Sequence, residues 1–201
     1  MAGRLVLGLV LAFSWGAVIA APAPDGLELP GVNLGMTLDA WKALSFPGAD
    51  PAHVEPVCTD HSANPEYELV ATAADRKAGV VVCAYLGRYG RFTLPQAIVL
   101  GPEIQARRLR FTFVKGRLSS IEYRTSVNVY NDLTARLNAR YGPTVGVVRD
   151  SIKTELGPYP RVRQAWNTPR GRIELTDPVR PVSDMSVRLS ATTDGLPGRA
   201  S

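Results

Sequence analysis

Hydrophobic and polar residues alternate most regularly over positions 107–125, which read RRLRFTFVKGRLSSIEYRT. Leu109, Phe111 and Phe113 are apolar and are separated by single polar residues, the period of a β-strand that buries one face. Lys115-Gly116 suits a two-residue turn, because glycine accepts the positive φ that such turns need. The pattern therefore predicts an antiparallel hairpin with an apolar inner face and an arginine-rich outer face.

This turn also predicts which residues of the two strands face each other. With strict pairing, Ile121 would fall on the polar face. One extra residue at 119–120, a β-bulge, returns it to the apolar face. The expected facing pairs are then Val114–Arg117, Phe113–Leu118, Phe111–Ile121 and Leu109–Tyr123 and, on the outer face, Arg110–Glu122 and Arg108–Arg124.

Apolar residues at helical spacing predict two helices. Within LGMTLDAWKAL (34–44), Leu38, Trp41 and Leu44 share one face, and Thr37 is a suitable N-cap. The segment 126–143 carries a longer apolar stripe and ends at Gly-Pro, a strong helix stop. The residues of that stripe are Tyr130, Leu133, Leu137 and Tyr141.

Several shorter segments read as strands. They are 67–71, the β-forming run 79–86, two strands within 164–177 that contribute Trp166, Ile173 and Leu175 to the core, and 185–189. The pattern of 96–100 fits either a short strand or a buried turn of helix. Together with the helices they predict an α+β fold, in which two helices pack on an antiparallel sheet held by one disulfide. The order of elements also suggests two similar αβ halves.

The first twenty residues have the layout of a secretory signal peptide. Arg4 precedes an apolar run of 16 residues over 5–20, which is shorter than the roughly 20 that cross a bilayer. Val18 and Ala20 fit the small-residue positions, so we expect cleavage after Ala20 and export to the periplasm or the medium. We expect a signal peptide over 1–20, a flexible leader over 21–30, one domain over 31–194 and a disordered tail over 195–201.

The stretch HVEPVCTDH (53–61) holds both histidines of the chain and one of its two cysteines. In an oxidising compartment, Cys58 and Cys83 are expected to form a disulfide. The other candidate chemistry is a metal site, since three such ligands could hold a catalytic zinc. Because the spacing is not specific, we rank metal binding below the disulfide, with two solvated histidines as the plain alternative. The candidate ligands are His53, Glu55, Asp60 and His61.

Charge divides the chain unevenly, with a net charge of −4 over 21–100 and +8 over 101–201. An asymmetric charge can steer anionic partners, although it also serves solubility. On the outer face of the predicted hairpin, arginines could bind carboxylate, phosphate or sulfate groups in bidentate fashion. The alternative, ranked slightly ahead, is a solvated face whose charge prevents aggregation. The candidate anion-binding residues are Arg108, Arg110, Arg117 and Arg124.

Catalytic signatures are missing from the sequence. There is no GxSxG, HExxH or GxxxxGK[ST] motif. We therefore expect a non-enzymatic binding module without a cofactor, and keep a metal-dependent hydrolase that uses residues 53–61 as the alternative. The expected partner is an envelope protein or an anionic polymer or lipid surface. Nucleic acid is not expected, because Phe111, Phe113 and Tyr123 point to the predicted core and not between the arginines.

The opening LGMTLDAWKAL resembles the LGM(T/S)-helix start of small bacterial envelope proteins of the SmpA/OmlA type. The order of elements is similar to the two-repeat plan of the β-lactamase inhibitory protein family, with helices on an antiparallel sheet. The chain departs from both, since it lacks the lipidated cysteine of the first group and has cysteines for one disulfide instead of two. The resemblance implies an envelope protein that works by contacts through its exposed sheet face, and it assigns no functional residue.

Overall fold

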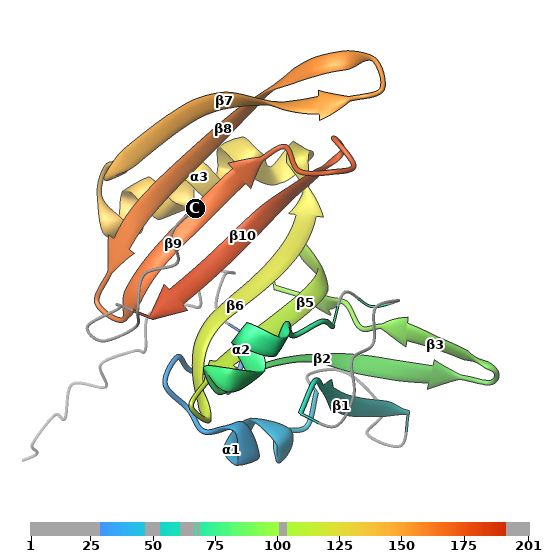
Figure 1. The fold of residues 1–201 in the computed structure, drawn as a ribbon. Helices are drawn as coiled ribbons and strands as arrows, with labels where there is room; N and C mark the ends of the chain where they lie inside the picture. The colour runs from blue at the N-terminus through green and yellow to red at the C-terminus, as the bar shows by residue number, and fades with distance from the viewer. Residues whose placement is uncertain (1–28, 47–52, 61–66, 68, 101–103, 192–201) are drawn as a thin grey trace, which may run out of the picture.

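The computed structural model describes residues 29–46, 53–60, 67, 69–100 and 104–191, which form mainly one antiparallel sheet (Figure 1). Its ten strands are β1 (Val54–Cys58), β2 (Val80–Tyr89), β3 (Phe92–Pro95), β4 (Ile98–Val99), β5 (Gln105–Val114), β6 (Arg117–Ser126), β7 (Gly146–Thr154), β8 (Gly157–Thr168), β9 (Gly171–Asp177) and β10 (Asp184–Ala191). The helices are α1 (Leu38–Lys42), α2 (Ala73–Lys77), the 3-10 turn η2 (Val127–Val129) and α3 (Tyr130–Tyr141). The predicted signal peptide, most of the leader and the tail lie outside the described residues.

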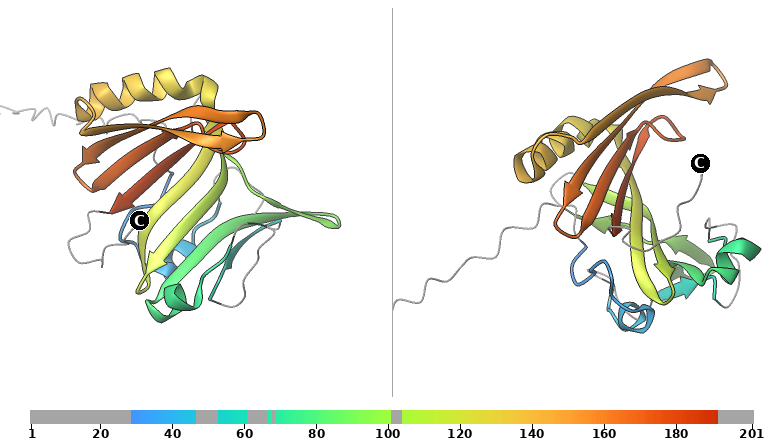
Figure 2. Two further views of the ribbon diagram at one scale, coloured as in Figure 1. Left: turned by 45° about the horizontal axis from the view of Figure 1, so that its top comes forward. Right: turned by 60° about the vertical axis from the view of Figure 1, so that its left-hand side comes forward.

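The sheet is made of two groups of strands joined in the middle. Its order is β1-β2-β5-β6-β10-β9-β8-β7, while β3 pairs with β2 and β4 with β5. Strands β7 to β10 follow one another as hairpins, and the last of them, β10, returns to pair with β6. Two hairpins, β2–β3 and β7–β8, project from the body of the molecule (Figures 1 and 2).

The predicted α+β fold class, with two helices packing on the sheet and two αβ halves, is wrong. Strands dominate, and the helices are short: α1 and α2 have five residues each and α3 has twelve. The sequence pattern missed β7, because seven of its nine residues are exposed and so show no alternation. The described residues of the predicted strand 67–71 form no strand either, and Thr72 next caps α2 with a capping box to Asp75.

Prolines also concealed the long strand β8. Pro158 and Pro160 argue against a strand, since proline cannot donate to a ladder. Strand β8 tolerates them because it pairs with β9 only from Val162 onward, whereas its earlier residues pair with β7 alone. The prolines thus lie where one side of the strand has no neighbour among the described residues.

The central hairpin, β5–β6, confirms the predicted turn and most of the register. Lys115 and Gly116 both have positive φ, 50° and 75°. The bulge falls at the expected place, so that Phe111 faces Ile121. A second bulge between Arg107 and Arg110 was not predicted, and it makes the expected pair Arg108–Arg124 wrong, because Arg107 now faces Arg124.

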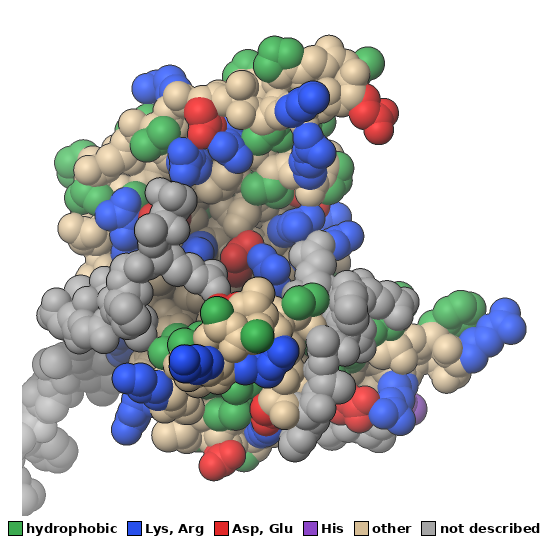
Figure 3. All heavy atoms as spheres, in the orientation of Figure 1, with side chains coloured by type: hydrophobic (Ala, Val, Ile, Leu, Met, Phe, Trp, Pro, Cys, Tyr) green, Lys and Arg blue, Asp and Glu red, His purple; other side chains and the backbone are tan. Residues whose placement is uncertain are grey.

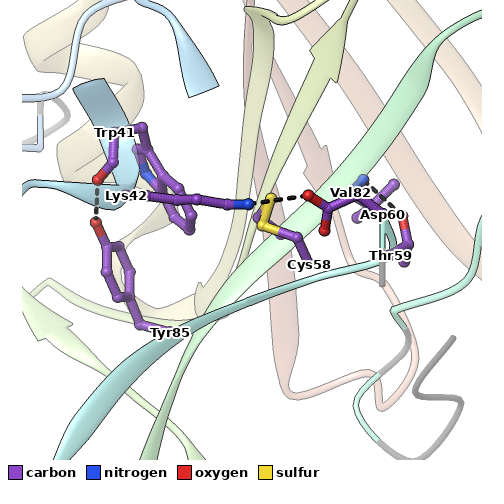
Figure 4. Close-up of a disulfide and its surroundings, with 8 residues drawn as sticks. Trp41, Lys42, Cys58, Thr59, Asp60, Val82 and Tyr85 are labelled. Atoms are coloured by element: carbon purple, nitrogen blue, oxygen red, sulfur yellow. Dashed lines mark hydrogen bonds and ion pairs between the residues drawn. A yellow bond between two sulfur atoms is a disulfide. The ribbon is translucent and has the colours of Figure 1, made fainter. Parts of the chain in front are cut away.

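An aromatic cluster under α1 forms the centre of the core in the first group of strands. The ring of Trp41 lies 4.6 Å from that of Tyr85, 4.8 Å from Phe111 and 5.6 Å from Phe113, measured between centroids. The hydroxyl of Tyr85 donates to the backbone oxygen of Trp41 at 3.2 Å (Figure 4). Burial raises the pKa of Tyr85 to about 12, so the phenol stays a donor at neutral pH.

Helix α3 covers the same face of the sheet in the second group of strands (Figure 2). Leu133 and Leu137 are fully buried, and the predicted core residues Trp166, Ile173 and Leu175 are buried with them. The indole nitrogen of Trp166 donates to Asn138 Oδ1 at 3.0 Å, which fixes the helix above β8.

On the opposite face, cover is confined to the β2 side of the described sheet. Ala84 and Leu86 alternate with the core residues of β2 and are nevertheless buried. Leu69 and Ala71, just before α2, are buried as well and lie outside the main core cluster, and α2 contacts β2. Beyond this second layer, no described element covers the middle of the sheet on that face.

Replacing Leu137 by Ala should lower the free energy of unfolding by about 2–5 kcal/mol, because it leaves a cavity between α3 and the sheet. Asn131→Ala, at an exposed position of the same helix, is the control and should change stability by less than about 0.5 kcal/mol. Urea denaturation monitored by circular dichroism measures both. Equal effects of the two variants would contradict the placement of α3.

Candidate functional site

The open face of the sheet is lined by charged side chains. Burial alternates along β5, β6, β9 and β10. The residues that point to the helices are mostly buried, and the residues that point to the opposite face are partly or fully exposed. Ser120 and Asp184 are exceptions, since they belong to the opposite face and are buried. We call this surface the polar sheet face, and Figure 3 shows it in view with charged side chains of both signs. Its charged residues are Arg107, Arg110, Glu122, Arg124, Arg163, Arg172, Glu174, Asp184 and Arg188.

One row across the strands alternates in charge. Arg110 faces Glu122, Glu122 faces Arg188, and Arg188 faces Glu174, on four consecutive strands. Arg110 Nη2 lies 2.8 Å from Glu122 Oε1, as the predicted pair requires. Opposite charges directly across an antiparallel ladder stabilise the pairing, so the backbone register itself sets this row.

The neighbouring row is cationic. It consists of Arg107, Arg124, Ser186, Thr176 and Arg163, which face one another in that order across five strands. Arg107 pairs with the buried carboxylate of Asp184 at 2.9 Å, and Arg124 donates to the carbonyl of Arg180 at 2.8 Å. The row itself therefore consists of arginine and hydroxyl side chains, with no acid among them.

Asp150 on β7 accepts a hydrogen bond from Arg163, the last residue of this row. Its two carboxylate oxygens accept from Arg161 Nε at 2.6 Å and Nη2 at 2.7 Å, and Arg163 Nη2 adds a third bond at 2.9 Å. The hydrogen bond from Arg161 holds the pKa of Asp150 below its usual range. One carboxylate thus serves two guanidinium groups.

The polar sheet face carries six arginines and three acidic residues, a surplus of three positive charges. Guanidinium groups suit carboxylates and similar anions, because the planar fork gives two parallel hydrogen bonds. The arrangement can bind a surface that has acidic groups opposite the arginines.

The four predicted anion-binding residues do not form one cluster. Arg110 and Arg124 lie on the polar sheet face, and Arg108 lies in the second bulge with a φ of 50°. Arg117 lies at the far end of the hairpin, where its Nη1 donates to the carbonyl of Gly35 at 3.1 Å. The alternation of 172–176 and 185–189 could have identified the missed residues Arg172 and Arg188.

Two of the four proposed metal ligands form ion pairs with basic side chains. Glu55 Oε1 accepts from Arg88 Nη2 at 2.6 Å, and Asp60 Oδ2 lies 2.9 Å from Lys42 Nζ (Figure 4). His53 precedes β1, and His61 lies outside the described residues. Within the described ranges, no three His, Cys, Asp or Glu side chains are grouped as metal ligands.

The predicted disulfide between Cys58 and Cys83 is present (Figure 4). The two cysteines face each other on β1 and β2 and are buried. Beside them, Thr59 N donates to the carbonyl of Val82 at 2.9 Å, and Val82 N donates to Thr59 Oγ1 at 3.0 Å. The bridge thus holds the edge strand β1, which contains Pro56, onto the sheet.

Two further groups with shifted pKa values lie at the start of α3 and at the end of β9. Burial raises the pKa of Asp177 on β9. Burial, and then the charge of Asp177, raise the pKa of Tyr130 at the start of α3. Asp177 has the same strand parity as the core residue Leu175, so this pair belongs to the covered side of the sheet.

The chain matches no protein-family model, no curated protein and no solved structure. The resemblance of its opening to small envelope proteins therefore stays a prediction. In the described part of the chain, no helix has the length and apolar character needed to span a membrane. The disulfide fits an extracellular or periplasmic location.

Opening the disulfide should destabilise the protein. The cysteines are 25 positions apart, and closing such a loop contributes about 3.5 kcal/mol in the chain-entropy model. We expect the midpoint of urea unfolding to fall when dithiothreitol is added. The double variant Cys58→Ala/Cys83→Ala is the control, because its midpoint should be lower and indifferent to dithiothreitol. An unchanged midpoint for reduced wild-type protein would contradict a stabilising role.

Proposed function

We propose that this chain is an exported, non-enzymatic binding protein of the bacterial envelope, and that an acidic surface of another envelope protein docks on its polar sheet face. The signal-peptide layout of residues 1–20 supports export, with cleavage after Ala20 and release into the periplasm or the medium. The disulfide supports the same compartments.

The single observation that carries this proposal is the charged middle of the sheet, which no described element covers on this face. In Figure 3 the surface is hollowed between the β7–β8 hairpin and the part that holds α2, and blue and red side chains lie there. One side of the sheet is closed by α1 and α3, whereas β5, β6, β9 and β10 present Arg110, Glu122, Glu174 and Arg188 on the other. A rigid sheet holds such groups in fixed positions, which limits the entropy lost on binding.

The charge pattern favours a protein over a uniform polyanion. Glu122 and Glu174 lie between the arginines and would repel a polymer that is negative along its whole length. A folded partner can place acids opposite the arginines and basic or neutral groups opposite the glutamates. Such complementarity gives specificity and fast association.

No observation on the described residues favours the metal-dependent hydrolase. Of its candidate ligands, Glu55 and Asp60 form ion pairs with Arg88 and Lys42. The adjacent Cys58 is bonded to Cys83. We therefore advance the binding function alone.

A photocrosslinking amino acid in place of Arg188, at the exposed centre of the polar sheet face, should yield a discrete adduct in the cells that make this protein. The same group at Asn131, exposed on α3, should not. An adduct formed only from Asn131 would place the partner on the helix side and contradict the proposal.

Charge removal tests the same face. The variant Arg124→Ser/Arg163→Ser/Arg188→Ser should lower the yield of the adduct from a crosslinker at Ser186 about tenfold or more, because three cations are lost at the contact. The variant Arg76→Ser/Arg140→Ser/Arg149→Ser loses the same charge away from this face. It should change the yield of the adduct by less than about twofold. The adduct should also decline with salt. Equal losses in both variants would show that net charge, and not this face, recruits the partner.

A further inference from the structure

The projecting β2–β3 hairpin is an amphipathic ribbon. Tyr89 faces Phe92 across the ribbon and Gly87 faces Leu94, so the three large side chains lie on one side of it. They are 51%, 58% and 53% exposed for Tyr89, Phe92 and Leu94. The other side carries Arg88 opposite Thr93. No described element covers the apolar side at these residues.

This apolar side continues the core face of β2 beyond the core. Tyr85, four residues earlier on the same side of the strand, is buried against Trp41 and Phe46. The ribbon then extends past α1 into solvent (Figures 1 and 2). Tyr89 OH donates to Gln96 Oε1 at 3.0 Å, which helps to hold the projecting strands together.

The ribbon is also basic. Residues 80–95 include two arginines and no acidic residue. The guanidinium carbon of Arg91, at the turn, lies 5.2 Å from the ring centroid of Phe92. Arg88 pairs with Glu55 on the opposite side of the ribbon, so the charge of Arg91 remains at the tip.

We propose that the tip of the β2–β3 hairpin inserts into the headgroup region of an anionic lipid surface. Aromatic and leucine side chains next to arginine are the composition of interfacial anchors, in which apolar groups enter the boundary and cations bind the headgroups. A stable protein contact buries about 800 Å² from each partner, whereas the apolar side of this ribbon consists of three large side chains. A lipid surface requires only that the tip enters.

The β7–β8 hairpin ends in a similar way. Leu156 at its turn is completely exposed, and the hairpin carries four basic and two acidic residues. It offers a second exposed apolar tip, where the charges of Lys153 and Glu155 balance. Neither tip belongs to the polar sheet face, so lipid binding does not depend on the proposed function.

A tryptophan placed at the tip reports insertion directly. The purified chain without residues 1–20 has Trp41 and Trp166, which are both fully buried. The emission of Phe92→Trp should therefore shift to the blue and be quenched by brominated lipids in phosphatidylcholine vesicles that contain phosphatidylserine. A tryptophan at Val99, exposed on β4, should remain unquenched.

Partitioning onto the same vesicles, measured by sedimentation, separates the contributions. Phe92→Ser should weaken binding about tenfold, because the ring no longer enters the boundary. Val99→Ser removes a similarly exposed apolar residue away from the tip and should leave binding unchanged. Arg91→Gln should weaken binding about fivefold on the anionic vesicles and have no effect on pure phosphatidylcholine.

Failure is unambiguous. Absence of wild-type binding to the anionic vesicles, unshifted and unquenched emission from the Phe92→Trp variant, or equal losses for Phe92→Ser and Val99→Ser would each overturn the proposal. Adducts from the polar sheet face would be unaffected by that outcome, and loss of those adducts would leave vesicle binding intact.

Discussion

The pairing of β6 with β10 is the interaction on which the rest of the structure depends. It joins the first and last strand groups through seven facing pairs, from Asp184–Ser126 to Ser190–Ser120. Because directly opposite residues share a face, this register puts Val187 beside Tyr123 in the core and Arg188 beside Glu122 outside it. A shift by one residue would exchange the two sets and remove both the core and the charged row. Core and candidate site are therefore fixed by one set of backbone hydrogen bonds.

The distribution of cover over this sheet decides what each region can do. Trp41 and the short helix α1 close one end of the core, and α3 closes the other through Leu133 and Leu137. These covers end before the hairpins do, which is why Tyr85 is buried while Tyr89 is exposed on the same side of one strand. On the opposite face, the middle of the sheet carries charged side chains, which disfavour association with another sheet.

Sequence patterns predicted the strands in which burial alternates along the chain and missed β7, which is exposed on both faces. The β5–β6 hairpin, α3, β9 and β10 were found because a covered face imposes a period on the residues, as at Leu109, Phe111 and Phe113. In β7 both Val147 and Val148 are exposed, because no described element covers either face there, so no period arises. The sequence predicted only part of the candidate site. The pair Arg110–Glu122 was predicted because both residues belong to one hairpin. Their neighbours Arg188 and Glu174 were not, because that contact depends on pairing between strands distant in sequence.

The two charged rows have different consequences for binding. One row alternates in charge and is neutral overall, so it is stable without a partner. It would bind favourably only to a surface whose charges alternate in the complementary order. This row is Arg110–Glu122–Arg188–Glu174. The row from Arg107 to Arg163 lacks acids of its own and relies on Asp184 and Asp150 at its ends. Because Asp150 already accepts from Arg161 and Arg163, an acidic partner would relieve a local excess of positive charge there. Specificity would thus come from the first row and attraction from the second.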